Sequence, residues 1–300
     1  MNHLLSIEEL TGDQIRDLVS LGSRMKAQRG RDPQVLAGQQ WALIFTKSST
    51  RTRVSFEVGI RELGGSAMFL SGSEIQLGRG EPIKDTARVL GRMIHGAVIR
   101  TFAQKDVVDF AHFSSIPTVN ALTDEEHPCQ ILADLLTIQE HLGTWQGKRV
   151  AFLGDGDCNV ARSWIWAAAR GGFDLVIGAP KPFQPAADFM ARVPSGHITV
   201  TDDPAAAVAG ADAIYTDVWV SMGKEEEASE RIDILRPWQL SDALLRQAPP
   251  HALVMHCLPA YRGKEITEDV MEAHARTIFD QAENRLHAQK AVLLTLAENR

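Results

Sequence analysis

Cysteine is scarce in this sequence, with three residues in 300, at Cys129, Cys158 and Cys257. Their number is odd, and no two of them form a C-x-x-C motif. A disulfide framework is therefore not expected, and the pattern fits a reducing cytosol.

The sequence also lacks a long hydrophobic run and an excess of positive charge. Its start, MNHLLSIEELTGDQIRDLVSLG, mixes apolar and charged residues at helical spacing, without the apolar core of a signal peptide. No window reaches the length of a membrane span. The net charge is −7, so nothing attracts the whole chain to nucleic acid or an anionic membrane. We expect a cytoplasmic protein with neither partner.

Length and apolar pattern indicate an α/β fold with two domains, each a mostly parallel sheet flanked by helices. A chain of 300 residues exceeds the size at which one core usually stops growing. The expected domains are 1–142 and 143–300, and a helix at about 284–300 could pack back on the first domain. The expected strands are 40–45, 66–70, 96–102, 118–122, 148–153, 174–178, 211–216 and 252–256.

Ligands of open parallel sheets bind beyond the carboxyl ends of the strands, and the stretch KSSTRTRVSFE follows such a strand. A helix begins within it, and the free N–H groups and dipole of a helix start favour an anion. The added donors are Ser49, Thr50, Arg51 and Thr52. A capped helix with a solvated first turn is the alternative, but basic residues there oppose the dipole. We interpret the stretch as a phosphate site.

Two further residues follow strand-like segments, and one of them, His127, could act on a carbonyl group. Arg100 ends an apolar strand, and His127 opens a helix, whose N-terminus disfavours protonation of the ring. A neutral imidazole can donate a hydrogen bond to a carbonyl oxygen. Considered without the other motifs, Arg100 could form a surface salt bridge, and His127 could be the N-cap of its helix.

Other strand ends carry weaker signals. The turn Gly154-Asp-Gly-Asp-Cys-Asn159 only partly matches a dinucleotide fingerprint, and its two aspartates would repel a pyrophosphate. A tight turn capped by Asn159 is an equal alternative. Asp217 could cap a helix or bind an ammonium group. No second ligand pair accompanies His256-Cys257, so we expect no metal.

Five motifs in this order resemble the ornithine carbamoyltransferase family, within the aspartate/ornithine carbamoyltransferase superfamily. They are Ser49-Thr-Arg-Thr-Arg53, His127-Pro-Cys-Gln130, Asp217-Val-Trp-Val-Ser-Met-Gly223, His256-Cys-Leu-Pro259 and Phe279-Asp-Gln-Ala-Glu-Asn-Arg285. The similarity covers nearly the whole chain. The first motif fits any carbamoyltransferase, including the aspartate enzyme, whereas Ser-Met-Gly and His-Cys-Leu-Pro point to ornithine. The family usually has Gly-Asp-Gly-Asn-Asn, so the turn at 154–159 contains one extra residue.

The resemblance implies transfer of the carbamoyl group of carbamoyl phosphate to the side-chain amine of L-ornithine, giving L-citrulline and phosphate without a cofactor. Carbamoyl phosphate would contact Ser49, Thr50, Arg51, Thr52, Gln76, Arg100, His127, Gln130, Cys257, Leu258 and Arg285. Ornithine would contact Asn159, Asp217, Ser221 and Met222. Arg100, His127, Asp217 and Cys257 would be catalytic. Gln76 would come from a neighbouring subunit of a homotrimer with shared sites.

Several alternatives remain open at this point. The acceptor amine could be putrescine or an acylated ornithine, and the reaction could serve arginine biosynthesis or arginine breakdown. A nicotinamide-dependent oxidoreductase would use the turn at 154–159, but the next strand ends Ile177-Gly-Ala-Pro180 without an acidic residue for a ribose. A non-catalytic anion-binding module is the third class.

Overall fold

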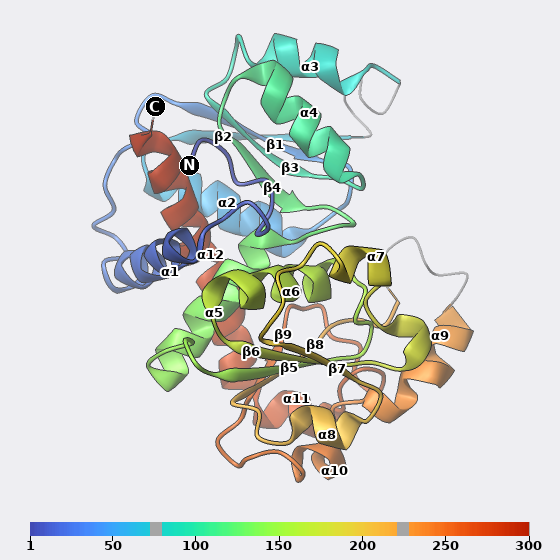
Figure 1. Ribbon diagram of the computed structural model, residues 1–300. Helices are drawn as coiled ribbons and strands as arrows, with labels where there is room; N and C mark the ends of the chain where they lie inside the picture. The colour runs from blue at the N-terminus through green and yellow to red at the C-terminus, as the bar shows by residue number, and fades with distance from the viewer. Residues whose placement is uncertain (73–79, 221–227, 300) are drawn as a thin grey trace. The chain divides into compact units, whose positions relative to one another are not determined.

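The computed structural model describes residues 1–72, 80–220 and 228–299, and the chain forms two compact units (Figure 1). The first comprises Met1–Leu136 together with Glu283–Arg300, and the second comprises Thr137–Ala282. Each unit contains a parallel sheet flanked by helices, which confirms the predicted fold class. Among the described residues, no helix is both long and apolar enough to cross a membrane.

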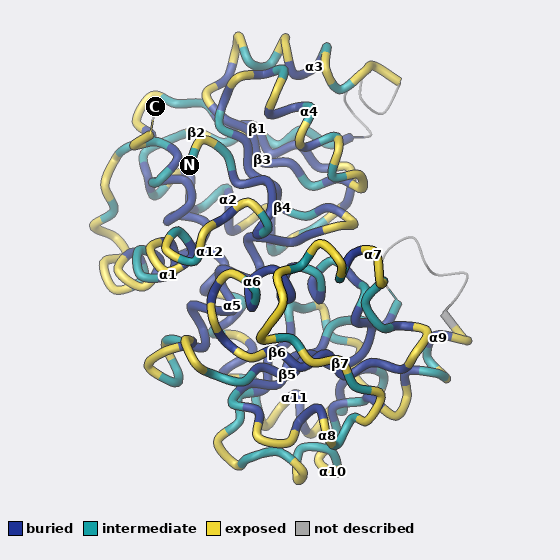
Figure 2. The backbone as a smooth tube through the Cα atoms, in the orientation of Figure 1, coloured by how far each residue is buried: buried dark blue, intermediate teal, exposed yellow. Residues whose placement is uncertain are grey.

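The sheet of the first unit has the strand order β2-β1-β3-β4, and every neighbouring pair is parallel. Its strands are β1 (Gln40–Phe45), β2 (Ser66–Ser71), β3 (Gly96–Arg100) and β4 (Thr118–Leu122). Its helices are α1 (Gly12–Ala27), α2 (Thr50–Glu62), α3 (Ile83–Leu90), α4 (Gln104–Ser114) and the first part of α5 (Pro128–Leu142). The central strands β1 and β3 are apolar and buried (Figure 2), as expected where helices cover both faces of a parallel sheet.

A topological switch point lies between β1 and β3. From β1 the chain continues to β2 on one side, and β3 then pairs with β1 on the other side. The register pairs Phe45 with Arg100, so the carboxyl ends of β1 and β3 lie next to each other. Residues that follow these two strands therefore meet where ligands of such sheets bind.

The sheet of the second unit has the strand order β7-β6-β5-β8-β9, again with parallel neighbours throughout. Its strands are β5 (Arg149–Leu153), β6 (Asp174–Gly178), β7 (Ile198–Thr201), β8 (Ala213–Thr216) and β9 (Leu253–His256). Its helices are α6 (Asn159–Gly171), α7 (Ala187–Met190), α8 (Pro204–Val208), α9 (Ala228–Leu235), α10 (Asp242–Leu245), α11 (Glu268–Ala273) and the start of α12 (Ala275–Glu298), with 3₁₀ turns η2 (Lys181–Phe183) and η4 (Arg236–Trp238).

The register of the second sheet aligns three strand ends. Leu153 of β5 pairs with Thr216 of β8, and Thr216 pairs with His256 of β9. The residues after these strands, Gly154, Asp217 and Cys257, are therefore neighbours at one edge.

Some elements have patterns too weak to predict from the sequence. Strand β7 is the clearest case, because it lies at the sheet edge and its residues are only partly buried or exposed. Short helices such as α7 and α10 contain four residues each, fewer than a helical period needs to be recognised. The expected strand at 96–102 ends at Arg100 instead, and Phe102 is exposed.

Helix α12 returns the chain to the first unit, where it lies beside α1. Ala288 lies so close to Gly22 that a Cβ at Gly22 would be 3.5 Å from the Ala288 Cα. Lys290, which has no exposed surface, pairs with Asp32 and donates to the Glu62 carboxylate at 2.7 Å. These contacts fix the position of α12, and with it the side chains that α12 contributes.

Candidate active site

Helix α2 begins beside the switch point of the first sheet. Ser49 is its N-cap residue, and Ser49 Oγ accepts a hydrogen bond from the Thr52 backbone N–H at 3.2 Å. The Ser49 hydroxyl also donates to Thr52 Oγ1 at 3.0 Å. The first turn contains no acidic residue, so the positive end of the helix dipole is available to an anion.

The three cations of the stretch KSSTRTRVSFE have different surroundings. Lys47 is buried and pairs with Asp124. The guanidinium of Arg53 lies 3.8 Å from the centre of the Phe69 ring. Arg51 lies, partly exposed, on the first turn of α2. Of these three described cations, Arg51 is the one we assign to an anion at the helix end.

His127 is buried immediately before the first residue of α5. The pKa of His127 lies well below its usual value, because burial disfavours the charged ring and because Arg285 and Arg100 add positive charge nearby. The ring is therefore neutral at neutral pH. The sequence suggests a neutral ring for another reason, the helix dipole, whereas burial and two guanidinium groups are the causes here.

Arg285 of α12 connects two other elements of the first unit. Its Nη2 donates to Thr52 Oγ1 of α2 at 2.8 Å, and its Nη1 donates to Gln130 Oε1 of α5 at 3.0 Å. All three side chains are buried. The first unit thus brings together five of the predicted residues, which are Thr52, Arg100, His127, Gln130 and Arg285.

The second unit holds a carboxylate and a thiol in contact. The Cys257 thiol donates to Asp217 Oδ1 at 2.8 Å. Loss of water contact raises the pKa of Asp217, although the neighbouring His256 and the hydrogen bond from the Cys257 thiol act in the opposite direction. The pair gives the second unit a group suited to an amine, because a carboxylate can pair with an ammonium and a neighbouring thiol can orient it.

The turn after β5 does not have the free space of a dinucleotide site. Gly154 has a φ of 119°, and a Cβ there would lie 3.2 Å from the indole nitrogen of Trp219. The Gly156 N–H donates to the Phe183 carbonyl at 2.8 Å, and a Cβ at Gly156 would lie 2.5 Å from the Ile177 side chain. Protein atoms thus crowd both glycines, which a pyrophosphate would have to approach.

The cap of α6 requires a correction. Cys158, not Asn159, is the N-cap residue, since Cys158 Sγ accepts from the Ala161 N–H at 3.5 Å and Asn159 is the first helical residue. The pKa of Cys158 lies well above its usual value, owing first to burial and then to the nearby charges of Asp155 and Asp217.

Thr50 is the first residue of helix α2, and four other predicted site residues remain. Gln76, Ser221 and Met222 lie outside the described residues. Leu258 has a φ of 58°, and its backbone N–H donates to His256 Nδ1 at 2.8 Å. That N–H is therefore occupied, so a contact from this segment to a carbamoyl amide would use a backbone carbonyl.

The structure adds polar residues that the motifs do not single out. Asp134 accepts a hydrogen bond from Gln130 Nε2 at 2.8 Å, and its position four residues after Gln130 on a helix was a readable signal. Arg231 forms a buried ion pair with Asp155 and donates to the Trp219 carbonyl at 2.8 Å. No local pattern predicts that pair, because α9 and the turn after β5 are far apart in sequence.

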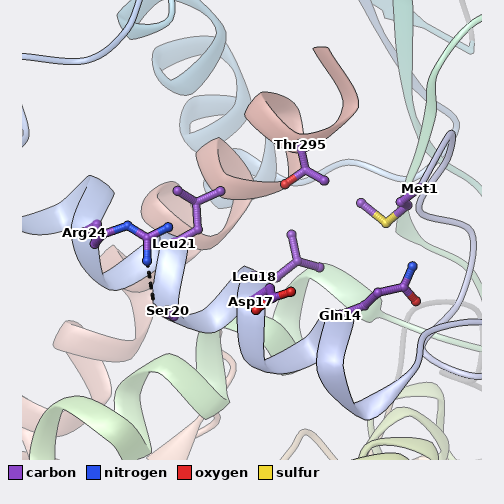
Figure 3. A pocket seen from close by; sticks show the side chains of 8 residues that line it. All are labelled: Met1, Gln14, Asp17, Leu18, Ser20, Leu21, Arg24 and Thr295. Atoms are coloured by element: carbon purple, nitrogen blue, oxygen red, sulfur yellow. Dashed lines mark hydrogen bonds between the residues drawn. The ribbon is translucent and has the colours of Figure 1, made fainter. Parts of the chain in front are cut away.

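Two other kinds of site are a metal site, for which the described part of the chain offers no group of ligands, and a surface pocket, which lies apart from the residues above. Within the described ranges, no group of three or more His, Cys, Asp or Glu side chains could hold a metal ion. A pocket of about 230 Å³ lies in the first unit between Met1, helix α1 and Thr295 of α12 (Figure 3). None of the described candidate residues lines it, and its Arg24 donates to Ser20 of the same helix at 3.0 Å.

The described groups together define a class of protein. A helix end suited to an anion, a neutral imidazole beside two guanidinium groups and a carboxylate–thiol pair are typical of an enzyme that transfers a carbonyl-containing group from a phosphorylated donor.

Comparison with known proteins agrees with that class. Residues 2–140 match the model of the aspartate/ornithine carbamoyltransferase carbamoyl-P binding domain, and residues 146–296 match that of the Asp/Orn binding domain. The chain is 63% identical to an ornithine carbamoyltransferase of Akkermansia muciniphila, over 100% of this chain and 99% of that protein. It is 47% identical to one of Methanocorpusculum labreanum, with 97% of each chain covered.

Solved structures show the same similarity. Ornithine carbamoyltransferase from Pyrococcus furiosus has a TM-score of 0.94 and 42% identity, covering 100% of this chain and 98% of that one. Anabolic ornithine carbamoyltransferase from Campylobacter jejuni has a TM-score of 0.93 and 38% identity, covering 100% of both chains. The chain therefore belongs to the aspartate/ornithine carbamoyltransferase family, as its motifs predict.

Proposed function

We propose that the protein transfers the carbamoyl group of carbamoyl phosphate to the side-chain amine of L-ornithine, giving L-citrulline and phosphate. The observation that carries this proposal is the buried cluster of the first unit, where Arg285 joins Thr52 to Gln130 beside a neutral His127. The whole-chain similarity to several ornithine carbamoyltransferases supports ornithine as the acceptor.

The first unit binds the donor. Ser49, Thr50, Arg51 and Thr52 surround the phosphate at the start of α2, where N–H groups, hydroxyls and one guanidinium can all donate. Gln76 of a neighbouring subunit completes this set. Arg100, His127 and Thr52 donate to the carbonyl oxygen of the carbamoyl group. Gln130 and the backbone carbonyls of Cys257 and Leu258 accept from its amide group, and Arg285 helps to hold that group through its hydrogen bond to Gln130 Oε1.

The second unit binds the acceptor. Asn159, Asp217, Ser221 and Met222 bind the amino-acid end of ornithine, while Cys257 and Asp217 orient the side-chain amine. A primary alkylamine has a pKa of about 10.4, so its neutral, nucleophilic form is scarce at neutral pH. The site must therefore favour loss of a proton from that amine before attack.

The chemistry then proceeds by addition and elimination at the carbonyl carbon. The amine nitrogen forms a bond to that carbon, and negative charge grows on the carbonyl oxygen, where Arg100 and His127 donate. The carbon–oxygen bond to phosphate breaks, and the phosphate takes the second amine proton. Removal of one donor to such an oxyanion typically lowers the rate by ~10²–10³.

The oxidoreductase alternative has no support at the turn after β5, where protein atoms crowd Gly154 and Gly156. We further propose a cytoplasmic homotrimer with shared sites that acts in arginine biosynthesis. The similarity to an anabolic enzyme of Campylobacter jejuni supports the biosynthetic direction.

A screen of amine acceptors with carbamoyl phosphate tests this function. Purified protein should release phosphate and form citrulline with L-ornithine, and use putrescine or N-acetylornithine orders of magnitude less efficiently, because groups for the α-amino acid would be left without partners. Equal kcat/KM for ornithine and putrescine would refute ornithine as the specific acceptor. Absence of phosphate release with every amine would refute the proposed transferase activity.

A further inference from the structure

We propose that Asp134 is a positioning residue that makes Gln130 present its oxygen, rather than its nitrogen, to the amino group of the carbamoyl donor. This inference rests on the proposed function, because it concerns how the enzyme recognises carbamoyl phosphate. It assigns to Asp134 the selection of a carbamoyl group over an acyl group of the same shape.

The geometry restricts the Gln130 amide at both ends. Gln130 Nε2 donates to Asp134 Oδ1 at 2.8 Å, and Gln130 Oε1 accepts from Arg285 Nη1 at 3.0 Å. Gln130 and Asp134 are four residues apart on α5, and so lie on the same face of the helix. Gln130 is 1% exposed and Asp134 is 0% exposed, so water does not compete for these contacts.

A carboxylate is well suited to this task because it only accepts hydrogen bonds. A glutamine amide has a donor end and an acceptor end of nearly the same shape. Opposite Asp134, only the donor end fits, so the oxygen must face the other way. That oxygen has two lone pairs, and can accept from Arg285 and from a substrate N–H together.

The orientation matters for the choice of donor substrate. The carbamoyl NH₂ group carries only N–H donors, so an amide oxygen attracts it and an amide NH₂ repels it. A methyl group in the same position would gain nothing from that oxygen and would leave it partly unsatisfied. Asp134 thus acts on selectivity through Gln130, without contacting the substrate itself.

A matched pair of stable ligands measures this selectivity directly. Phosphonoacetamide and acetonylphosphonate both carry a phosphonate, a methylene and a carbonyl, and differ only in NH₂ against CH₃. Their dissociation constants are measured by calorimetry on the intact protein, which needs no catalytic turnover. We expect the wild-type protein to prefer phosphonoacetamide by about tenfold, the value of one good hydrogen bond.

Asp134→Ala should reduce that preference to about twofold or less, because the amide loses the acceptor that orients it. The preference of Asp134→Asn for phosphonoacetamide should lie between those of the wild-type protein and Asp134→Ala. The reason is that an amide at position 134 accepts in one orientation and donates in the other. Asp32→Asn is the control, because Asp32 is a buried carboxylate of the same unit that pairs with Lys290 instead. It should leave the ratio unchanged.

A double variant provides the rescue. Gln130→Glu with Asp134→Asn exchanges acid and amide, and a carboxylate at position 130 offers oxygen in either orientation. This variant should recover the preference for phosphonoacetamide, and it decides the question even if Asp134→Ala does not fold.

The outcomes separate the inference from the function on which it rests. An unchanged ratio in Asp134→Ala, an equal loss of affinity for both ligands, or no recovery in the folded double variant would each overturn the inference. A wild-type protein that binds both ligands equally would also overturn it, while leaving phosphate-directed binding in place. A wild-type protein that binds neither ligand and forms no citrulline would instead overturn the proposed function.

Discussion

Arg51 and Arg53 stand two residues apart on α2, yet their guanidinium groups meet different surroundings. Arg53 lies over the Phe69 ring, whereas Arg51 lies on the first turn, where the helix dipole favours an anion. The two positions thus offer a matched test of a binding role against a packing role within one motif.

Arg51→Ala should lower kcat/KM for carbamoyl phosphate by at least ~100-fold, because a charge-assisted pair to the phosphate is lost. Arg53→Ala should keep activity within a few-fold of wild type and lose about 0.5–1 kcal/mol of stability with its ring contact. Steady-state kinetics and urea denaturation measure the two quantities. Similar activity losses in both variants would contradict the division of roles.

At the residue scale, Asp217 is a second case of interest, because its ionised form opposes folding. Its pKa is raised by loss of water contact, so the folded state binds a proton more tightly than the unfolded state. Between the ordinary pKa and the raised one, stability should therefore fall as pH rises, and the cost persists above that interval.

Asp217→Asn should accordingly raise Tm by about 2 °C at pH 7, with a smaller gain below the ordinary carboxyl pKa. The same variant should lose most of its activity with ornithine, because the charge that pairs with the amine is gone. Calorimetry between pH 3.5 and pH 7 measures the gain, with the exposed carboxylate variant Asp174→Asn as control. A gain that is equal at both pH values would show that ionisation of Asp217 is not its cause.

At the scale of elements, helix α12 links the first unit's stability to its site. The helix carries Arg285 near one end of its first-unit segment and the buried Lys290 five residues further on. Lys290 pairs with Asp32 and Glu62, so its charge is compensated only while α12 stays in register with the loop before β1 and with α2.

Lys290→Met should destabilise the protein by about 3 kcal/mol, because it leaves two carboxylates around an apolar side chain. The exposed variant Lys105→Met removes a cation from the pair with Asp109, and should cost under about 0.5 kcal/mol. Urea denaturation of both variants gives the comparison. A loss below about 1 kcal/mol for Lys290→Met would show that the buried network is not a determinant of stability.

At the scale of the whole molecule, the proposed assembly is a closed ring of three chains with heterologous interfaces. A site that draws Gln76 from one subunit and Asp217 from the next would depend on assembly for its activity. Mixing of two inactive variants tests that dependence.

Gln76→Ala and Asp217→Ala homotrimers should each be poorly active. After dissociation, mixing in equal amounts and reassembly, about one quarter of the sites should combine two intact residues and regain activity. Mass spectrometry of differently labelled chains confirms that subunits have exchanged. No regained activity after confirmed exchange would show that Gln76 acts within its own chain, and would leave the carbamoyltransferase activity in place.

The sequence by itself determined the local features of this protein. Runs such as Trp41-Ala-Leu-Ile-Phe45 predict buried strands because parallel strands are covered on both faces. The hydroxyl and guanidinium groups after that strand indicate an anion site, because the chemistry of a helix start depends only on nearby residues. These inferences need no knowledge of which strands are neighbours.

Only the tertiary structure decided strand order, register and side-chain partners. Asp217 meets Cys257 because β8 pairs with β9, and Arg285 meets Thr52 and Gln130 because α12 joins the first unit. Each outcome depends on packing between segments far apart in the chain, and local periodicity and propensity carry no information about such pairs.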